Sequence, residues 1–229
     1  MTIKQFEDQT LAHYSYAIVS DGKMALVDPA RDPMPYYEYA ESSNAAIVAV
    51  FETHPHADFV SSHLQIHKET GATIYVSKLL GADYPHKTFD DGDSLSMGKL
   101  LFKAINTPGH SPDSITIIAT DKHGKNAMFT GDTLFVGDVG RPDLREKVGN
   151  MKAKREELAS SMYHTIQSKY SHLSDDTLVY PAHGAGSLCG SNLGGESSST
   201  LGTARLTNWA FKNLTEEEFV KHLLSDQPF

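Results

Sequence analysis

Two histidines and a carboxylate directly after a short apolar run constrain this chain more than any other feature. The run AAIVAVF at residues 45–51 is followed almost at once by His54, His56 and Asp58. An apolar run this short, rich in Val and Ile, is typical of a strand buried on both faces. Imidazole and carboxylate groups are the usual ligands of zinc and non-haem iron. The pattern therefore predicts a metal site where a buried strand ends, with further ligands from elsewhere in the chain.

Composition limits the classes of function that need to be considered. The chain has 229 residues, and we expect one domain over residues 1–229. Its net charge of -9 argues against a nucleic-acid surface, because phosphate binding needs clustered Lys and Arg. The sequence lacks a long apolar run and the basic-then-apolar order of a signal peptide. With one cysteine, Cys189, it has no internal disulfide. We therefore expect a cytoplasmic protein without nucleic-acid or membrane partners.

Hydrophobic periodicity and turn signals predict a chain in which strands and helices are mixed. Strands are expected at residues 11–19, 24–28, 45–51, 73–76, 99–106, 114–119, 127–130 and 177–180. Helices are expected at residues 34–42, 60–70 and 151–170, and after the capping box formed by Thr215 and Glu218. The Gly/Ser-rich residues 184–203 predict a functional loop or a flexible spacer.

Four of the predicted strands end in a loop that carries His or Asp. The residues concerned are His54, His56 and Asp58, then His110, Asp132 and His183. Strands that feed loops at one edge of a sheet bring distant parts of a sequence together. A single His after Pro-Gly, or a single Asp after Gly, would be interpreted as a turn residue. The joint pattern is what predicts a metal site.

The segments THPHAD, TPGHSPDS, FTGDTLF and YPAHG, in this order, resemble the metallo-β-lactamase superfamily over residues 11–225. The resemblance implies an α/β (α+β) fold, a four-layer αββα sandwich with the site along one edge of the sheets. Most hydrolases of this superfamily have a second His directly after the Asp of the first motif. Phe59 occupies that position here and cannot coordinate, so one metal is expected. His63, one helical turn further on, is not expected to replace the missing ligand.

HADFVSSH, FVGDVGRPDL, HGAGSLCG and SSTLGTARLTNWAF resemble the persulfide dioxygenases, in particular a bacterial branch often fused to rhodanese domains. The resemblance implies one Fe(II) per chain, held by His54, His110 and Asp132. Two imidazoles and a carboxylate are also the ligands typical of non-haem Fe(II) oxygenases. The implied substrates are O₂ and a low-molecular-weight persulfide, such as glutathione persulfide, and the implied products are sulfite and a thiol.

The same resemblance gives supporting roles to other residues. His56, Asp58 and His183 are expected to orient the ligands and water. Three further residues are candidates for substrate binding: Arg141, Tyr180 and Cys189.

Each of these three candidates has a structural alternative. Arg141 suits a substrate carboxylate, but it could instead pair with Asp143. Tyr180 could face the metal or belong to the strand core. Cys189 could react with a persulfide near the iron or be a thiol without a role.

The main alternative function is a glyoxalase-II-like zinc hydrolase of thioesters. In that case His54, His56 and His110 would bind zinc, and Asp58 and Asp132 would handle protons or a weak second metal. The missing second-metal histidine argues against this alternative. A non-enzymatic domain serving a fused partner is disfavoured by the intact His/Asp set. Residues 225–229 fall where relatives with rhodanese domains continue, so a rhodanese domain or protein is a candidate partner. A homo-oligomer stays open.

Overall fold

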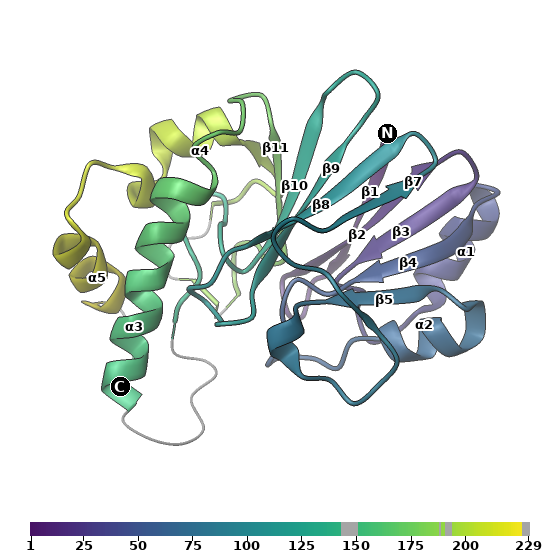
Figure 1. Ribbon diagram of the computed structural model, residues 1–229, viewed down its shortest axis with the longest axis horizontal. Coiled ribbons are helices and arrows are strands. Elements are labelled where there is room, and N and C mark those ends of the chain that lie inside the picture. Colours follow the sequence, from purple (N-terminus) through teal and green to yellow (C-terminus); the bar gives the residue numbers. More distant parts are fainter. Residues whose placement is uncertain (143–150, 188, 191–193, 226–229) are drawn as a thin grey trace.

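Two six-stranded sheets lie face to face, with helices on both outer sides (Figure 1). The computed structural model describes residues 1–142, 151–187, 189–190 and 194–225. The arrangement is the four-layer αββα sandwich expected from the motifs. None of the described helices is long and apolar enough to cross a membrane.

The first sheet has the spatial order β1-β2-β3-β4-β5-β6. Its strands are β1 (Thr2–Asp8), β2 (His13–Ser20), β3 (Lys23–Val27), β4 (Ala46–Phe51), β5 (Thr73–Val76) and β6 (Lys87–Thr88). Antiparallel pairing joins β1 to β2 and β2 to β3, and parallel pairing joins the strands from β3 to β6. The parallel crossovers place α1 (Met34–Ser42) and α2 (His63–Thr70) on its outer face, and the short 3-10 helix η1 (Lys78–Leu80) follows β5.

The second sheet has the spatial order β12-β11-β10-β9-β8-β7. Its strands are β7 (Ser94–Met97), β8 (Leu100–Asn106), β9 (Ile115–Thr120), β10 (Asn126–Gly131), β11 (Leu178–Pro181) and β12 (Ser199–Thr200). The pair β10–β11 is parallel and the other pairs are antiparallel.

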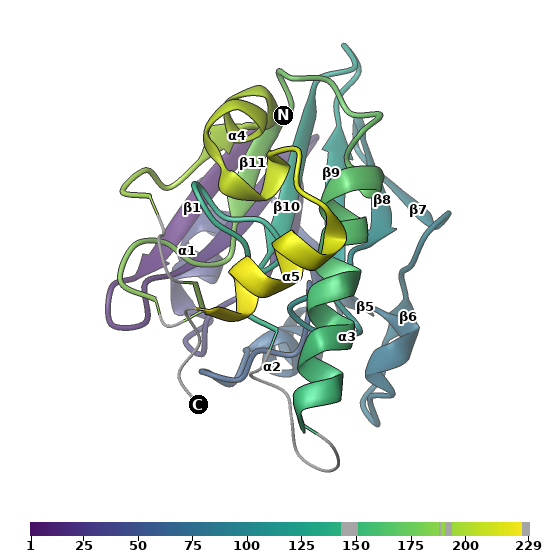
Figure 2. The same ribbon diagram turned by 90° about the vertical axis from the view of Figure 1, so that its left-hand side faces the viewer.

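The helices over the second sheet come from the last third of the chain (Figure 2). They are α3 (Met151–His164), the π-helical turn η2 (Thr165–Lys169), α4 (Leu201–Thr207), the 3-10 helix η3 (Trp209–Phe211) and α5 (Glu216–Ser225). The expected capping box opens α5, because the Glu218 N–H donates to Thr215 Oγ1 at 3.3 Å and the Thr215 N–H donates to Glu218 Oε2 at 2.8 Å.

Two sequence predictions need correction. The helix expected at 151–170 ends as an α-helix at His164, because the next residues form the π-helical turn. The segment 184–203 is not wholly a loop or spacer, because β12 and the start of α4 lie at its end. The edge strands β1, β6 and β7 were not expected either, since they are short or largely exposed and lack a buried apolar run.

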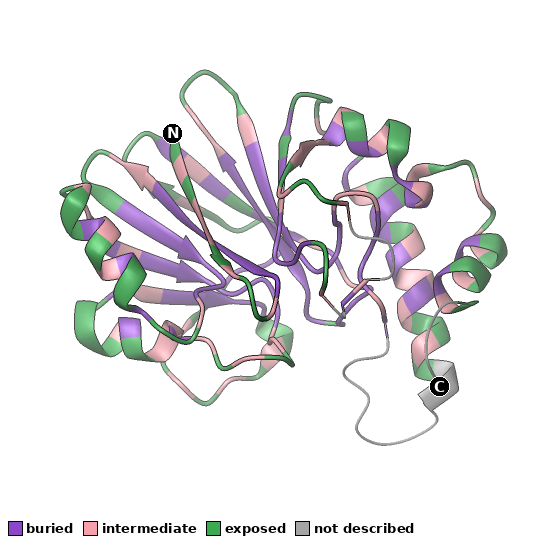
Figure 3. Cartoon of the chain, turned by 180° about the vertical axis from the view of Figure 1, so that it is seen from behind, coloured by how far each residue is buried: buried purple, intermediate pink, exposed green. Residues whose placement is uncertain are grey.

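Three clusters of buried apolar residues hold the four layers together. Buried residues, purple in Figure 3, lie mainly along the strands of both sheets. Between the sheets, Phe51, Phe102 and Phe129 are fully buried. Ile66 of α2 packs under the first sheet, and Phe219 of α5 belongs to the cluster under the second. This packing fixes the two sheets against each other, so the loops that follow β4, β8, β10 and β11 are held in place.

Candidate metal centre

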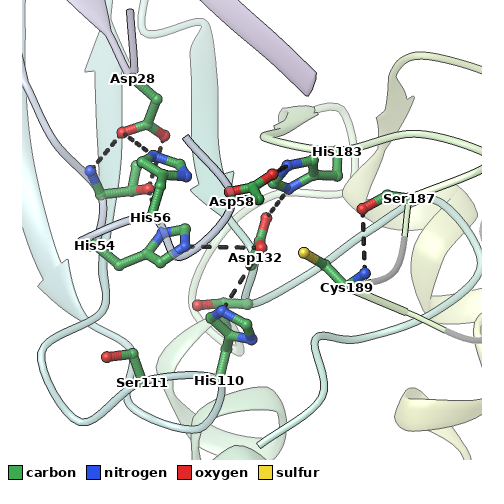
Figure 4. Close-up of polar contacts among 12 residues, drawn as sticks. Asp28, His54, His56, Asp58, His110, Ser111, Asp132, His183, Ser187 and Cys189 are labelled. Atoms are coloured by element: carbon green, nitrogen blue, oxygen red, sulfur yellow. Dashed lines mark hydrogen bonds and ion pairs between the residues drawn. The ribbon is translucent and has the colours of Figure 1, made fainter. Parts of the chain in front are cut away.

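The loops after β4, β8 and β10 bring His54, His110 and Asp132 together (Figure 4). We call these three residues the trio. The Nε2 atoms of His54 and His110 lie 3.7 and 3.6 Å from Asp132 Oδ2. All three side chains are buried, and their nearest ligand-type atoms lie within 4.8 Å of one another. The structure therefore brings these three residues, predicted to lie where strands end, together at one point.

A buried hydrogen-bond chain orients the ring of His54. The Thr53 hydroxyl donates to Asp28 Oδ2 at 2.7 Å, so it accepts from His54 Nδ1 at 3.0 Å. The Thr53 N–H donates to Asp28 Oδ1 at 2.7 Å. With its proton on Nδ1, His54 presents the Nε2 lone pair to Asp132. Burial and the nearby His56 lower the pKa of His54, which keeps it in the neutral form that binds metals.

A backbone carbonyl orients the ring of His110 in the same way. Its Nδ1–H donates to the carbonyl oxygen of Arg141 at 2.7 Å, which leaves the Nε2 lone pair directed at Asp132. Burial lowers the pKa of His110, so this imidazole is also neutral. Gly140 makes the close approach of this segment feasible, because a Cβ there would lie 1.8 Å from the backbone oxygen of Asp132.

The third loop depends on a glycine with a left-handed backbone. Gly131, directly before Asp132, has φ of +54°, and a Cβ there would lie 2.4 Å from Thr53 Oγ1. Any larger residue would strain the turn and push against the group that orients His54. Thr53, Asp28 and these glycines were not singled out from the sequence. Asp28 follows the end of β3, so the strand-end rule could have found it.

A second group lies next to the trio and consists of Asp58, His183 and Cys189. His183 Nδ1 donates to Asp132 Oδ1 at 2.6 Å, and its Nε2 donates to Asp58 Oδ2 at 2.9 Å. Ionised carboxylates only accept, so His183 donates from both nitrogens as an imidazolium. Burial alone would lower the pKa of His183, but the buried Asp132 carboxylate raises it far above its usual value.

Cys189 completes this second group. Its sulfur lies within 4.8 Å of the nearest ligand-type atoms of Asp58 and His183. Burial and the Asp132 carboxylate raise the pKa of the thiol. The side chain faces the centre where the sequence hypothesis of a persulfide reaction would need it.

A cavity of about 280 Å³ opens over both groups. Its lining comprises the trio, Asp58 and Cys189, together with Thr10, Leu11, Ala57, Gly186 and Ser187. A small substrate entering this cavity therefore meets the trio on one side and the second group on the other.

His56 does not belong to the trio. Its Nε2 lies 3.3 Å from Asp28 Oδ1, while its ring packs beside that of His54 with 4.2 Å between ring centroids. Phe59 packs against His56 and against His13, at centroid distances of 4.4 and 4.2 Å. Position 59, where a second metal would need a histidine ligand, thus carries a phenyl ring that packs against two other histidines.

Two of the predicted substrate-binding residues are absent from the cavity lining. Tyr180 stacks on Phe129 with 5.5 Å between centroids and belongs to the core between the sheets. Arg141 contacts the centre through its backbone, accepting from His110 and donating to the Cys189 carbonyl oxygen at 3.0 Å. The alternative partner Asp143 lies outside the described residues.

The trio fits a catalytic iron or zinc ion. It offers two neutral imidazole nitrogens and one carboxylate oxygen, each held by a hydrogen bond behind it and each facing a cavity. Although burial alone would raise it, the pKa of Asp132 lies well below its usual value because of the positive His183. Asp132 is therefore ionised and available as a ligand.

Comparison with known proteins identifies relatives of two activities. Residues 9–183 match the family model of the metallo-beta-lactamase superfamily. The human mitochondrial persulfide dioxygenase ETHE1 is 30% identical over 198 residues, which cover 86% of this chain and 69% of that protein. A hydroxyacylglutathione hydrolase from Tolumonas auensis is 31% identical over 172 residues, which cover 72% of this chain and 59% of that protein.

Two solved structures match the whole chain. A metallo-beta-lactamase from Staphylococcus aureus subsp. aureus COL has a TM-score of 0.93 at 37% identity, covering 100% of this chain and 69% of that chain. ETHE1 from Myxococcus xanthus has a TM-score of 0.82 at 27% identity, covering 100% of this chain and 92% of that chain.

Proposed function

We propose that this chain, which belongs to the metallo-beta-lactamase superfamily, is a non-haem Fe(II) persulfide dioxygenase. The observation that carries the proposal is the identity of the third ligand. Asp132 joins His54 and His110, while His56 lies beside Asp28 instead. Two imidazoles and one carboxylate are the ligand set typical of non-haem Fe(II) oxygenases. The similarity to human ETHE1 supports the same conclusion.

The proposed overall reaction converts a persulfide, O₂ and one water into a thiol and sulfite. The S–S bond breaks, the terminal sulfur loses four electrons, and O₂ is reduced by them. An iron held by the two Nε2 atoms and Asp132 Oδ2 would supply adjacent open positions at which persulfide and O₂ can meet. Glutathione persulfide is the proposed substrate, because glutathione also appears in the name of the hydrolase relative.

The protein groups around the trio have separable tasks. His183 holds Asp132 Oδ1, so Oδ2 remains directed at the two imidazoles. Asp58, which lines the cavity, holds the other nitrogen of His183 and so keeps a proton on it. Leu11 and Ala57 give that wall an apolar part suited to the sulfur end of a substrate.

A zinc hydrolase of glutathione thioesters is the second candidate, favoured by the similarity to the Tolumonas auensis protein. It would require His56 to leave Asp28 and join His54 and His110. A second metal near Asp58 and His183 would also lack the ligand that Phe59 replaces. The arrangement of these side chains makes this the weaker candidate.

Two parallel assays on one preparation test the proposal. Protein purified without oxygen is loaded with iron or with zinc, and each form is given glutathione persulfide or an S-acylglutathione thioester. We expect the iron form to consume O₂ and release one sulfite per persulfide, with no thioester hydrolysis by either form. Thioester hydrolysis by the zinc form, with no O₂ uptake by the iron form, would contradict the proposal.

A further inference from the structure

A third group of metal-ligand residues lies beside His54 and shares no residue with the trio. Asp28, Glu52 and His56 bring ligand-type atoms within 4.8 Å of one another. Asp28 and Glu52 are 2% and 5% exposed, and the side chain of His56 is 1% exposed. Asp28 and His56 are seen together in the upper left of Figure 4. We call these three residues the inner group.

The inner group has hydrogen-bonding capacity that the described residues do not use. Neither ring nitrogen of His56 has a hydrogen-bond partner among them, although Nε2 is directed at Asp28 Oδ1 from 3.3 Å. Buried polar groups almost always have partners, because an unmade hydrogen bond costs free energy. Asp28 accepts two hydrogen bonds from Thr53, and Glu52 accepts one from Ser61. A carboxylate has about four acceptor positions, so both retain spare lone pairs.

The charges of the inner group also favour a bound cation. Two buried carboxylates lie close together, and the ion pairs that reach them come from histidines, His56 on Asp28 and His63 on Glu52 at 3.5 Å. Buried carboxylates are normally paired with a cation or bound to a metal. A divalent cation among the three side chains would meet both needs, since it would neutralise the carboxylates and give His56 a partner.

We propose that Asp28, Glu52 and His56 form a second divalent-cation site, separate from the trio. Two carboxylates and one imidazole suit Mn²⁺ or Fe²⁺, and Zn²⁺ next. Two ligands of one ion lie at most about 4 to 4.5 Å apart, at bonds of about 2.0 to 2.2 Å. The observed spread within 4.8 Å thus needs only a small closure of the side chains.

The inner group is reachable from outside and is linked to the trio. A cavity of about 300 Å³ has Glu52, His56 and His63 in its wall and is separate from the cavity over the trio, although His54 lines both. Asp28 anchors Thr53, which orients His54. A cation on Asp28 would therefore fix the chain of hydrogen bonds that directs the His54 lone pair.

Anomalous diffraction from crystals of the metal-free protein soaked in Mn²⁺ tests the proposal. We expect a manganese peak among Asp28, Glu52 and His56 in the wild type. The Glu52→Gln variant should lose this peak and keep the trio, whereas Asp132→Asn should keep it. A wild-type map without manganese in the inner group overturns the proposal and means that His56 carries at most a proton there.

Counting bound Mn²⁺ in solution gives an independent test, with Asp90→Asn as the matched control. Asp90 is also buried, but its carboxylate is used by Ser77 and by the backbone of Lys78. Wild type and Asp90→Asn should bind one more Mn²⁺ per chain than Glu52→Gln. Equal counts in wild type and a folded Glu52→Gln protein overturn the proposal. If circular dichroism shows that Glu52→Gln does not fold, the wild-type diffraction result decides.

Discussion

The trio lies beside the second group of Asp58, His183 and Cys189, yet the two groups differ in the ligand atoms that they leave open to a metal. In the trio, the nitrogens stand 3.7 and 3.6 Å from Asp132 Oδ2, which suits ligands that share an ion and is long for hydrogen bonds. In the second group, His183 contacts its carboxylates at 2.6 and 2.9 Å, which are hydrogen-bond distances. Similar residue types are therefore spaced for a shared metal ion in one place and for hydrogen bonds in the other.

The partners behind each imidazole explain the difference. Thr53 and the Arg141 carbonyl occupy one nitrogen of His54 and His110, and the other nitrogen stays open. Both nitrogens of His183 are occupied by carboxylates. Whether a histidine becomes a metal ligand is thus decided by the groups behind it.

The largest expected effect comes from Asp132, which belongs to the trio and also holds His183. Asp132→Asn should lose the iron of the trio and dioxygenase activity together, with iron affinity of the trio reduced by more than about 100-fold, because the only carboxylate in the trio becomes a neutral amide. Metal analysis after dialysis and O₂ uptake measure the two losses. Asp90→Asn serves as the control. An iron content in Asp132→Asn equal to that of the wild type would show that the trio is not the ligand set.

Replacing Phe59 with histidine would make the second group more like a metal site. A His at position 59 would offer a nitrogen near Asp58 and His183, so Phe59→His should bind one more zinc per chain than the wild type and gain thioester hydrolysis. Zinc content and hydrolysis of an S-acylglutathione measure the change, and Phe59→Leu is the control for lost ring packing. An unchanged zinc content would mean that the hydrogen bonds of His183, rather than the missing ligand, keep the second group free of metal.

A smaller effect is expected from the residue that orients His54. Thr53→Val keeps the size and branching of the side chain but removes the hydroxyl between Asp28 and His54. Iron affinity should fall by about 10- to 100-fold, the range typical of groups that orient ligands. Competition with a chelator measures it, and Thr130→Val, which removes another buried hydroxyl, is the control. An iron affinity equal to that of the wild type would show that the Thr53 hydroxyl does not orient His54 for metal binding.

The smallest effect is expected at Cys189. The pKa of its thiol is raised, which leaves little reactive thiolate. Because little thiolate is present to react, Cys189→Ser should retain turnover within about threefold of the wild type. Steady-state O₂ uptake measures turnover, and mass spectrometry looks for a persulfide on Cys189. A large loss in the variant, with an adduct on the wild-type cysteine, would instead support a sulfur relay.

The sequence predicted which residues meet, but it did not predict how each one turns. His54, His110 and Asp132 could be found because each follows a strand with a clear apolar pattern, and the ends of such strands meet at one edge. His56 follows the same strand as His54, yet the contact with Asp28 turns it away from the trio. That contact depends on how β3 and β4 pair, which no local pattern reveals.

The position of Tyr180 and the existence of the shortest strands also depend on contacts that no local sequence pattern reveals. Tyr180 is placed in the core by the packing of β11 against Phe129 and Tyr16, which depends on both sheets. The strands β6 and β12 have two residues each, which is too few to show a periodic pattern in the sequence. They form because they pair with a neighbouring strand of the sheet.

A crystal structure of the iron-loaded protein, with anomalous data at the iron edge, would show which side chains bind the iron. We expect iron in the trio, bound by Nε2 of His54, Nε2 of His110 and Asp132 Oδ2, with His56 still beside Asp28. A metal bound by His54, His56 and His110, with a second metal between Asp58 and His183, would contradict this expectation.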